Sequence, residues 1–378
     1  MKSEQLKTNK RSLLIENMYE VKRSKQEDWK KRYGDGVAWL RGAMIGRGNF
    51  GCVFAANLKN PKSRYSSYPP VMAVKSAEVS ASGSIQKEKE VMDNLRGCPN
   101  VIKCFGEETT VGDNGQMVYN LLLEYGSGGT LADLVKSLNG ERLAEIEVRR
   151  YARSIVYGLS HIHKRGYVHC DLKPENVLLV SGCRTGTGEF VAKIGDLGLA
   201  KRVNHVKKNR LSCYWRGTPM YLSPEAVING VQEPSADIWA VGCIVFQMLT
   251  GKPIWFSDQD LGIEEILSRI CDENDMPFVS SGMSDEAVSF LKGCLCRKVM
   301  CRLTANMLLN HPFLKGLVED NVNEIEESHE VFDIYAITSS SSFSDDDGED
   351  ADGDDDDDDL WSSCCSDESS YNLSSWSE

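Results

Sequence analysis

The sequence of 378 residues contains no apolar run of the roughly 18 or more residues that a membrane-spanning helix requires. Its longest candidate, Ile238 to Thr250, has 13 residues and lies between Asp237 and Lys252, which is typical of a helix buried in a protein core. The first residues, MKSEQLKTNKRSLL, also lack the apolar segment of a secretion signal. We therefore expect a cytoplasmic protein that has neither a membrane nor a nucleic acid as a partner.

Basic residues are missing from the end of the chain. The last 41 residues contain 15 of the 56 acidic residues and no Lys or Arg, so residues 1–337 hold 41 acidic and 43 basic residues, a net charge of +2. The aspartate-rich run at 345–359 cannot bury apolar surface, which predicts a disordered tail at 316–378 that is acidic from 345. Such a run can bind basic partners or simply keep the protein soluble, and the second case is the more frequent. The basic stretch KKNR at 207–210 would permit entry into the nucleus as well.

Cysteines at a metal-binding spacing are absent as well. Three of the 13 cysteines lie close together, Cys294, Cys296 and Cys301, but their pattern C-x-C-x4-C has no fourth ligand at a spacing that zinc sites use. Without a sign of secretion, the cysteines are expected to be reduced. Buried thiols on helices are the simplest interpretation of these three residues.

The sequence does contain a change of pattern along its length. Residues 1–37 form a polar arm with one short apolar cluster. From Trp39, the short β-type runs WLRGAMIGRG, GCVFAANL and VMAVKSAEV are broken by glycine or loop residues, which predicts an antiparallel sheet. Apolar residues at helical spacing then take over, and the last clear group lies at 305–309. We predict an α+β fold with a β-rich N-terminal lobe at 38–124 and a helical C-terminal lobe at 127–315.

The first motif with chemical meaning is a glycine-rich turn between the first two predicted strands. In the stretch GRGNFGCV, Gly46, Gly48 and Gly51 have no side chains, so the backbone N–H groups of the turn can approach phosphates. Such a turn is weak evidence alone, because glycine hairpins are common. Lys75, which ends the run VMAVK, strengthens it, because an ammonium there can reach the α- and β-phosphates of a nucleotide when a carboxylate holds it.

The carboxylate that would hold Lys75 is expected on the next helix. Glu88 shares a helix face with the apolar residues Ile85 and Met92, whereas Glu90 lies about 200° further round the helix and should face solvent. Both glutamates could also be ordinary surface charges. We favour Glu88 as the partner of Lys75 and interpret only Glu90 as a surface charge.

The decisive motif is the segment VHCDLKPEN at 168–176, which is followed by GDLG at 195–198. Together with the motifs above, it resembles the protein kinase family over residues 39–314, because it fits the pattern H-R-D-L-x-x-x-N and the D-F-G turn. The resemblance implies a bilobal kinase fold, with ATP and Mg²⁺ as cofactors. It also implies that Asp171 orients or deprotonates the substrate hydroxyl and that Lys173 neutralises charge on the transferred phosphoryl group.

The resemblance assigns further residues to the nucleotide site. Asn176 and Asp196 would bind Mg²⁺. Leu123 would line the back of the adenine pocket, and the backbone of Glu124 and Tyr125 would bind the adenine edge. The other residues that the resemblance implies for cofactor binding are Ile45, Gly46, Gly48, Gly51, Val53, Ala73, Lys75 and Glu88.

Two segments indicate a kinase of the serine/threonine type. Lys173 in DLKPEN and the segment GTPMYLSPE at 217–225 resemble serine/threonine kinases rather than tyrosine kinases. These segments and YNLLLEYGSGGTLADLV are most similar to plant MEKK-like mitogen-activated protein kinase kinase kinases, which implies MAP kinase kinases as protein substrates. The resemblance also implies that Glu225 pairs with Arg302 and that Thr218 contacts the catalytic loop.

Two residues depart from the family pattern. Cys170 stands where many kinases have arginine, so a guanidinium that could bind a phosphate in the activation segment, on Ser212 for example, is missing. Regulation by such phosphorylation should therefore be weaker. Leu197 replaces the phenylalanine of D-F-G, although leucine can fill the same apolar slot. Only these two residues favour the alternative of a pseudokinase that acts as a binding or scaffold protein, and DLKPEN and GTPMYLSPE speak against a kinase of small molecules.

Overall fold

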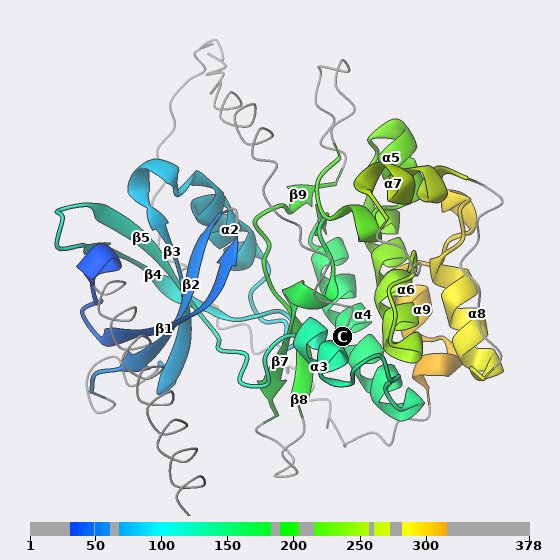
Figure 1. The fold of residues 1–378 in the computed structure, drawn as a ribbon, viewed down its shortest axis with the longest axis horizontal. Coiled ribbons are helices and arrows are strands. Elements are labelled where there is room, and N and C mark those ends of the chain that lie inside the picture. Colours follow the sequence, from blue (N-terminus) through cyan, green and yellow to red (C-terminus); the bar gives the residue numbers. More distant parts are fainter. Residues whose placement is uncertain are drawn as a thin grey trace, which may run out of the picture. The chain divides into compact units, whose positions relative to one another are not determined.

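The computed structural model describes residues 31–48, 50–60, 68–182, 190–203, 215–256, 261–272 and 282–315. Within these residues a β-sheet part precedes a mainly helical part, which confirms the predicted α+β fold (Figure 1). The predicted acidic tail, the basic stretch at 207–210 and Ser212 lie outside the described residues.

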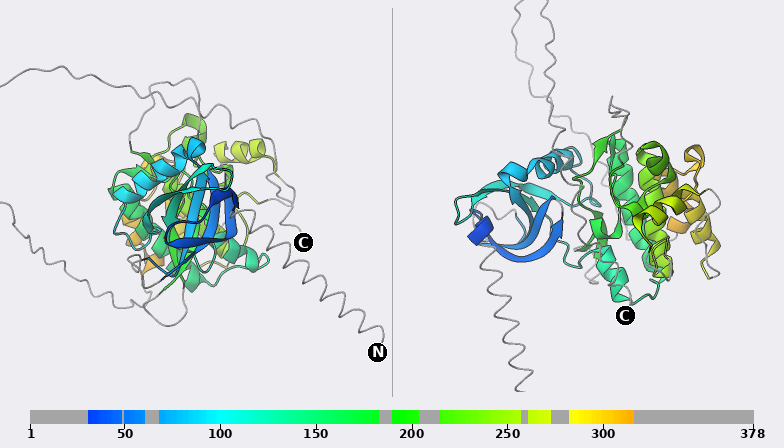
Figure 2. Two further views of the ribbon diagram at one scale, coloured as in Figure 1. Left: turned by 90° about the vertical axis from the view of Figure 1, so that its left-hand side faces the viewer. Right: turned by 45° about the horizontal axis from the view of Figure 1, so that its top comes forward.

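The N-terminal part contains a five-stranded antiparallel sheet in the order β1-β2-β3-β5-β4 (Figure 1; Figure 2, left). Buried residues alternate with more exposed ones in β2, as expected for a strand with one face on a core. The glycine-broken runs therefore do form strands, and Lys75 lies opposite Val53. The strands are β1 (Trp39–Gly48), β2 (Gly51–Leu58), β3 (Val71–Glu78), β4 (Cys104–Val111) and β5 (Met117–Leu123).

One face of this sheet is covered by residues that precede β1. Tyr33 is buried there, and Arg41 is only 1% exposed. The Arg41 guanidinium donates hydrogen bonds to Ser76 Oγ at 2.8 Å, to Asn120 Oδ1 at 2.8 Å and to the Gly34 carbonyl at 2.9 Å. A buried charge needs such partners, because desolvation without them is costly. The packing of the sheet thus extends to Tyr33, before the lobe boundary at residue 38 that the sequence indicated.

Helix α2 (Gly83–Asn94) packs beside β3 and β4. Its buried residues include Ile85, Glu88 and Met92, whereas Glu90 is exposed. The helix face predicted from the sequence is therefore confirmed. It directs one carboxylate, that of Glu88, toward the sheet.

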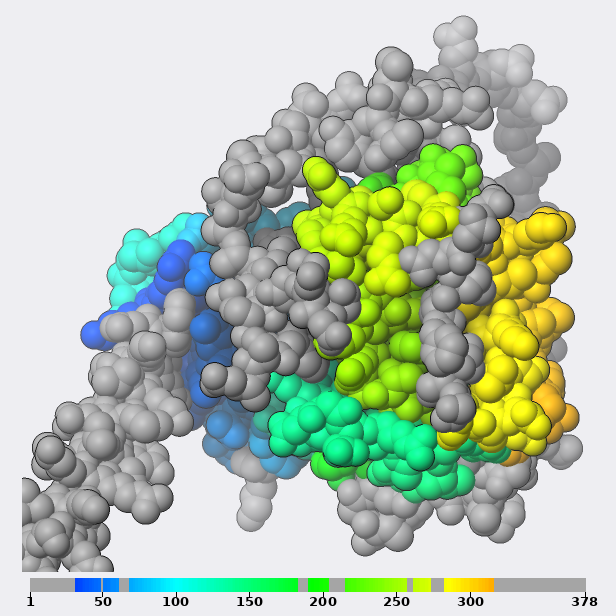
Figure 3. Space-filling view, turned by 45° about the vertical axis from the view of Figure 1, so that its right-hand side comes forward, coloured from blue at the N-terminus to red at the C-terminus, as the bar shows by residue number. Residues whose placement is uncertain are grey.

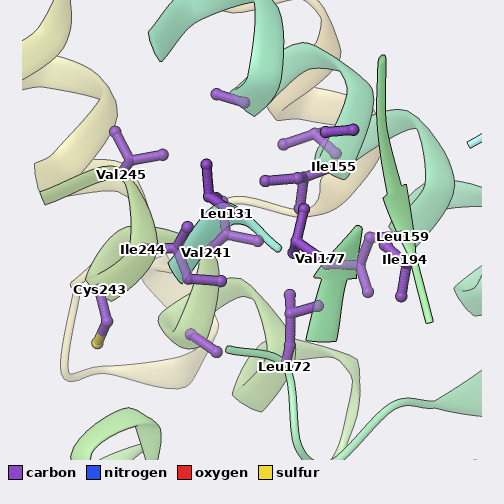
Figure 4. Packing of buried hydrophobic residues seen from close by; sticks show 14 of the residues in the cluster. Leu131, Ile155, Leu159, Leu172, Val177, Ile194, Val241, Cys243, Ile244 and Val245 are labelled. Atoms are coloured by element: carbon purple, nitrogen blue, oxygen red, sulfur yellow. The ribbon is translucent and has the colours of Figure 1, made fainter. Parts of the chain in front are cut away.

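The C-terminal part is built around helices α4 and α6, which pack against each other. Ile155 and Leu159 of α4 share one core with Val241 and Ile244 of α6 (Figure 4). Every residue of α6 from 236 to 249 is buried, which confirms the core helix expected there. The helices are α3 (Leu131–Ser137), α4 (Glu145–Lys164), α5 (Pro224–Asn229), α6 (Pro234–Thr250), α7 (Ile263–Cys271), α8 (Asp285–Cys294) and α9 (Ala305–Leu309).

The later helices form part of the surface of this C-terminal part. Figure 3 shows α7 in yellow-green and α8 and α9 in yellow to orange on one face. None of the described helices combines the length and the apolar character that a membrane span needs.

Short strands frame the two loops that carry the decisive motifs. Strand β6 (Tyr167–Val168) pairs with β9 (Lys201–Arg202), and β7 (Val177–Ser181) pairs with β8 (Phe190–Ile194), both antiparallel. One loop runs from β6 to β7 and the other from β8 to β9. The pairing of the four strands therefore brings the segments VHCDLKPEN and GDLG together.

The expectation of buried helical thiols holds for only one of the three neighbouring cysteines. Cys294 is buried in α8, whereas Cys296 is half-buried beyond the end of that helix and Cys301 is exposed. The expectation was wrong for Cys296 and for Cys301, because the chain after α8 turns toward the surface.

Candidate active site

The glycine-rich turn joins β1 to β2, with Gly48 opposite Gly51 and Gly46 opposite Val53. The fold itself requires Gly51, because its φ is +142° and a Cβ there would lie 2.5 Å from the Ser76 carbonyl oxygen. By contrast, a Cβ at Gly46 would meet Val53 at 3.8 Å, and one at Gly48 would meet no described atom within 4 Å. The described residues leave space beside these two glycines, as the close approach of a phosphate requires.

Lys75 joins helix α2 to the turn after β8. Its ammonium lies 2.6 Å from Glu88 Oε2 and 2.8 Å from Asp196 Oδ1. Burial works to lower the pKa of Lys75, but the two carboxylates outweigh burial and raise that pKa above its ordinary value. The Lys75 ammonium is therefore charged at physiological pH, and the ion pair predicted from the helix face is present.

Asp237, in the first turn of α6, shapes the loop that carries Asp171. Its carboxylate accepts hydrogen bonds from the backbone N–H groups of His169 at 2.9 Å and Cys170 at 3.0 Å, and it lies 2.8 Å from His163 Nε2. Cys170 has a φ of +67°, which is unusual for a residue with a side chain. Burial opposes the ionisation of Asp237, but the hydrogen bond with His163 holds the pKa of its carboxyl below the usual range. An anchored bend therefore directly precedes Asp171.

Both carboxylate oxygens of Asp171 have partners. Thr218 Oγ1 donates to Asp171 Oδ1 at 2.8 Å, and Lys173 Nζ lies 2.9 Å from Asp171 Oδ2 and 2.7 Å from Thr218 Oγ1. Asn176 Nδ2 donates to the Asp171 carbonyl at 2.8 Å. Carboxylate oxygens can accept more than one hydrogen bond, so Asp171 can still receive a substrate hydroxyl. The expected contact between Thr218 and the catalytic loop is present.

Asn176 and Asp196 offer oxygen ligands of the kind that Mg²⁺ prefers. Asn176 uses its amide nitrogen toward Asp171, which leaves Oδ1 for a metal, and the Asp196 side chain is 41% exposed. Burial acts to raise the pKa of Asp196, but the Lys75 ammonium holds it below the usual range. Among the described residues, no group of three or more His, Cys, Asp or Glu could hold a metal alone. The donor set fits Mg²⁺, which commonly binds one or two carboxylates together with substrate phosphates.

The end of β5 holds the residues predicted to contact adenine. Leu123 is half-buried opposite Ala73 of β3. The N–H of Glu124 donates to the Lys103 carbonyl at 2.8 Å, so only the Glu124 carbonyl is left for a nucleotide. Any contact of the Glu124 backbone with adenine would therefore be made by its carbonyl oxygen, and that contact stays a prediction. The other predicted lining residues lie on β1 to β3, where Ile45 is exposed, Val53 is half-buried and Ala73 is buried.

Two residues that the sequence reasoning missed lie beside this segment. The N–H groups of Tyr125 and Gly126 donate no hydrogen bond within the described part of the chain, so Gly126 joins Tyr125 as a candidate adenine contact. A Cβ placed on Gly126 would lie 3.2 Å from the Cβ of Leu178. A Cβ placed on Gly195 would lie 3.4 Å from the Cδ1 of the same leucine. Leu178 therefore lies between the segment after β5 and the turn that carries Asp196. Its position two residues after Asn176 was the only available signal.

The two departures from the family pattern are both buried. Leu197 is 1% exposed, and its N–H donates to Glu88 Oε1 at 3.1 Å, so leucine does fill an apolar slot beside the ion pair. Burial, with a smaller effect from Asp237, raises the pKa of the Cys170 thiol to about 12, so this thiol stays neutral. Far from the loop, Arg302 binds Glu225 through two hydrogen bonds of 2.6 Å and 2.9 Å, as the resemblance implied.

This fold and site define a protein kinase. The protein kinase domain matches residues 39–314, and the chain belongs to the protein kinase family as a serine/threonine kinase. It is similar to mitogen-activated protein kinase kinase kinase 20 of Arabidopsis thaliana, with 41% identity over 290 residues that cover 76% of this chain and 81% of the relative.

Two further relatives from Arabidopsis thaliana carry similar names. Mitogen-activated protein kinase kinase kinases 17 and 18 are 39% and 37% identical to the chain. The matches cover 74% and 73% of this chain and 70% and 77% of the respective relatives. These comparisons bear out the family resemblance and lend no support to the pseudokinase alternative.

Proposed function

We propose that this kinase transfers the γ-phosphoryl group of ATP to serine or threonine side chains of MAP kinase kinases, as an upper member of a signalling cascade. The observation that carries the proposal is that Asp171 binds both Thr218, at 2.8 Å, and Lys173, at 2.9 Å. This arrangement holds a general base and a positive charge next to each other, which phosphoryl transfer requires.

Each polar residue of the site has a role that follows from its position. Lys75, held by Glu88 and Asp196, supplies a fixed positive charge for the α- and β-phosphates. Asp171 accepts the proton of the substrate hydroxyl at a carboxylate oxygen, and Lys173 neutralises charge on the transferred group. Mg²⁺, when bound by Asn176 and Asp196, would supply further positive charge to the phosphates. Charge fixed in place in advance of the reaction is the main source of rate in such sites.

The substrate assignment rests on the relatives. All three bear the name mitogen-activated protein kinase kinase kinase, which supports MAP kinase kinases as the proteins phosphorylated. The acceptors would be serine or threonine in their activation segments.

The test is the transfer of labelled γ-phosphate from ATP and Mg²⁺ to a panel of MAP kinase kinases and to a generic basic protein. We expect the purified chain to label the kinase kinases preferentially and Asp171→Asn to lose the activity by at least about a hundredfold. Replacing the activation-segment serines and threonines of the substrate with alanine should abolish labelling. Equal labelling of every protein would refute the substrate assignment, and labelling by neither enzyme would refute phosphoryl transfer.

A further inference from the structure

A glutamine side chain in the loop between α5 and α6 forms hydrogen bonds with the backbone of the activation segment. Gln232 is 5% exposed. Its Oε1 accepts a hydrogen bond from the N–H of Arg216 at 2.9 Å, and its Nε2 donates to the carbonyl of the same residue at 2.7 Å. One carboxamide therefore satisfies both backbone groups of a single residue. Because both bonds are made inside the protein, they define the position of Arg216 relative to α6.

The residues that follow Arg216 meet the catalytic loop directly. Gly217 has a φ of +105°, and a Cβ there would lie 2.4 Å from the Cys170 carbonyl oxygen, so the two backbones touch. The next residue, Thr218, donates its hydroxyl to Asp171 Oδ1. Only two peptide units thus separate the residue held by Gln232 from the hydroxyl that binds Asp171. A displacement of Arg216 would be passed to Thr218 with little loss, because Gly217 is confined by its contact with Cys170.

The residue that follows Gln232 takes part in an ion pair. The ammonium of Lys201 lies 3.3 Å from Glu233 Oε1, so the neighbour of Gln232 pairs with the strand at the other end of the activation segment. Cys170 offers a buried neutral thiol instead of a cation. The loop before α6 therefore contacts the activation segment at two places: Gln232 binds the backbone of Arg216, and Glu233 pairs with Lys201. Neither contact uses a phosphate.

We propose that Gln232 is a positioning residue for phosphoryl transfer, whose carboxamide holds Arg216 so that Thr218 keeps Asp171 and Lys173 aligned. This inference rests on the proposed function, because alignment matters only if Asp171 acts on a substrate hydroxyl. It goes beyond that function in placing a determinant of kcat outside the nucleotide and catalytic motifs.

The test compares the wild type with Gln232→Met, which keeps the side-chain size and removes both hydrogen bonds. We expect kcat to fall about tenfold, because two hydrogen bonds that hold the active geometry are lost, while the KM for ATP stays unchanged. Hydrogen–deuterium exchange of residues 215–223 should become faster in the variant whether or not substrate is present. If Gln232→Met does not fold, Gln232→Glu keeps the acceptor for the Arg216 N–H but sets a second carboxylate oxygen against the Arg216 carbonyl, so kcat should fall at least as far.

A second comparison asks whether Gln232 acts through Thr218. In a Thr218→Val background, Gln232→Met should lower kcat by less than twofold, because the contact through which it acts is already gone. Ser160→Ala is a matched control, since it removes one buried hydrogen bond, to Asn306 at 2.6 Å, in another part of the helical core. It should lower thermal stability without changing kcat.

The outcomes separate this inference from the proposed function. A kcat for Gln232→Met within twofold of the wild type, or a loss that multiplies with that of Thr218→Val, would overturn the positioning role. Faster exchange at 215–223 with unchanged kcat would also overturn it, since the glutamine would then be merely structural. If the wild type transfers no phosphoryl group, the proposed function fails. If hydrogen–deuterium exchange at 215–223 is unchanged in Gln232→Met, the claim that Gln232 holds Arg216 in place is refuted.

Discussion

Replacing Glu88 with glutamine removes one negative charge from the buried group around Lys75 and hardly changes side-chain volume. Glu88 is 1% exposed, and its two oxygens accept hydrogen bonds from Lys75 at 2.6 Å and from the Leu197 N–H at 3.1 Å. The carboxamide oxygen can keep one of these bonds, and its nitrogen cannot accept the other. The perturbation is therefore confined to one charge and one hydrogen bond.

The structure sets the expected size of the effect. A hydrogen bond to a charged group contributes about 1.5–3 kcal/mol, which corresponds to roughly 10- to 100-fold in rate if it is needed only in the active arrangement. Asp196, 2.8 Å from the Lys75 ammonium, would remain as its only carboxylate partner in this group. Lys75 would then be drawn toward Asp196 and away from the phosphates. We expect kcat/KM for ATP to fall by about 100-fold in Glu88→Gln.

Glu90→Gln is the matched control, because Glu90 lies on the exposed face of the same helix. The measurement is steady-state phosphoryl transfer with varied ATP, together with thermal unfolding of both variants. Glu90→Gln should behave as the wild type in both assays. An activity in Glu88→Gln within threefold of the wild type would refute the claim that this carboxylate holds Lys75 in its active position.

Further predictions concern stability, pH and the glycine-rich turn. Glu225→Gln should lower the free energy of unfolding by about 3–5 kcal/mol in denaturant titrations, because it leaves the buried Arg302 guanidinium without its counter-charge. The pKa of Asp237 is lowered in the folded state, so its contribution to stability is present above its ordinary pKa of 3.8 and is lost as the pH falls through the lower pKa of the folded state. In Asp237→Asn, the free energy of unfolding measured against pH should therefore fall less steeply at acidic pH. Gly48→Ala should weaken ATP binding measured by calorimetry without changing thermal stability. Gly51→Ala should lower the melting temperature, because of these two glycines Gly51 is the one with a described backbone atom within 3 Å of a new Cβ.

The sequence was sufficient to predict a residue's role where the residue type and the spacing of nearby apolar residues together define it. The motif around Lys75 called for a carboxylate on the next helix, and the helix face selected Glu88, because only one of two nearby glutamates shares that face with apolar residues. The core position of α6 followed in the same way from an apolar run of limited length. These features depend on neighbours a few residues away, which a sequence displays directly.

The contacts that the sequence did not reveal join residues that are far apart or ordinary in type. Gln232 looks like any loop glutamine, and its role becomes visible only when the fold brings Arg216 to it. The N–H of Glu124 could not be known to bind Lys103, because that bond depends on how β4 and β5 pair. The burial of Arg41 likewise depends on the segment before β1, which folds over it. Tertiary packing decides each of these cases.

The bend before Asp171 links the helical core to the chemistry. A left-handed backbone conformation at a residue with a side chain costs about 1–2 kcal/mol, and Cys170 adopts it with a φ of +67°. The two backbone N–H groups that this bend presents are both bound by the Asp237 carboxylate, and hydrogen bonds to charged groups contribute about 1.5–3 kcal/mol each. The anchor therefore outweighs the strain. Since Asp237 belongs to the buried helix α6, the packing of that helix determines where Asp171 lies.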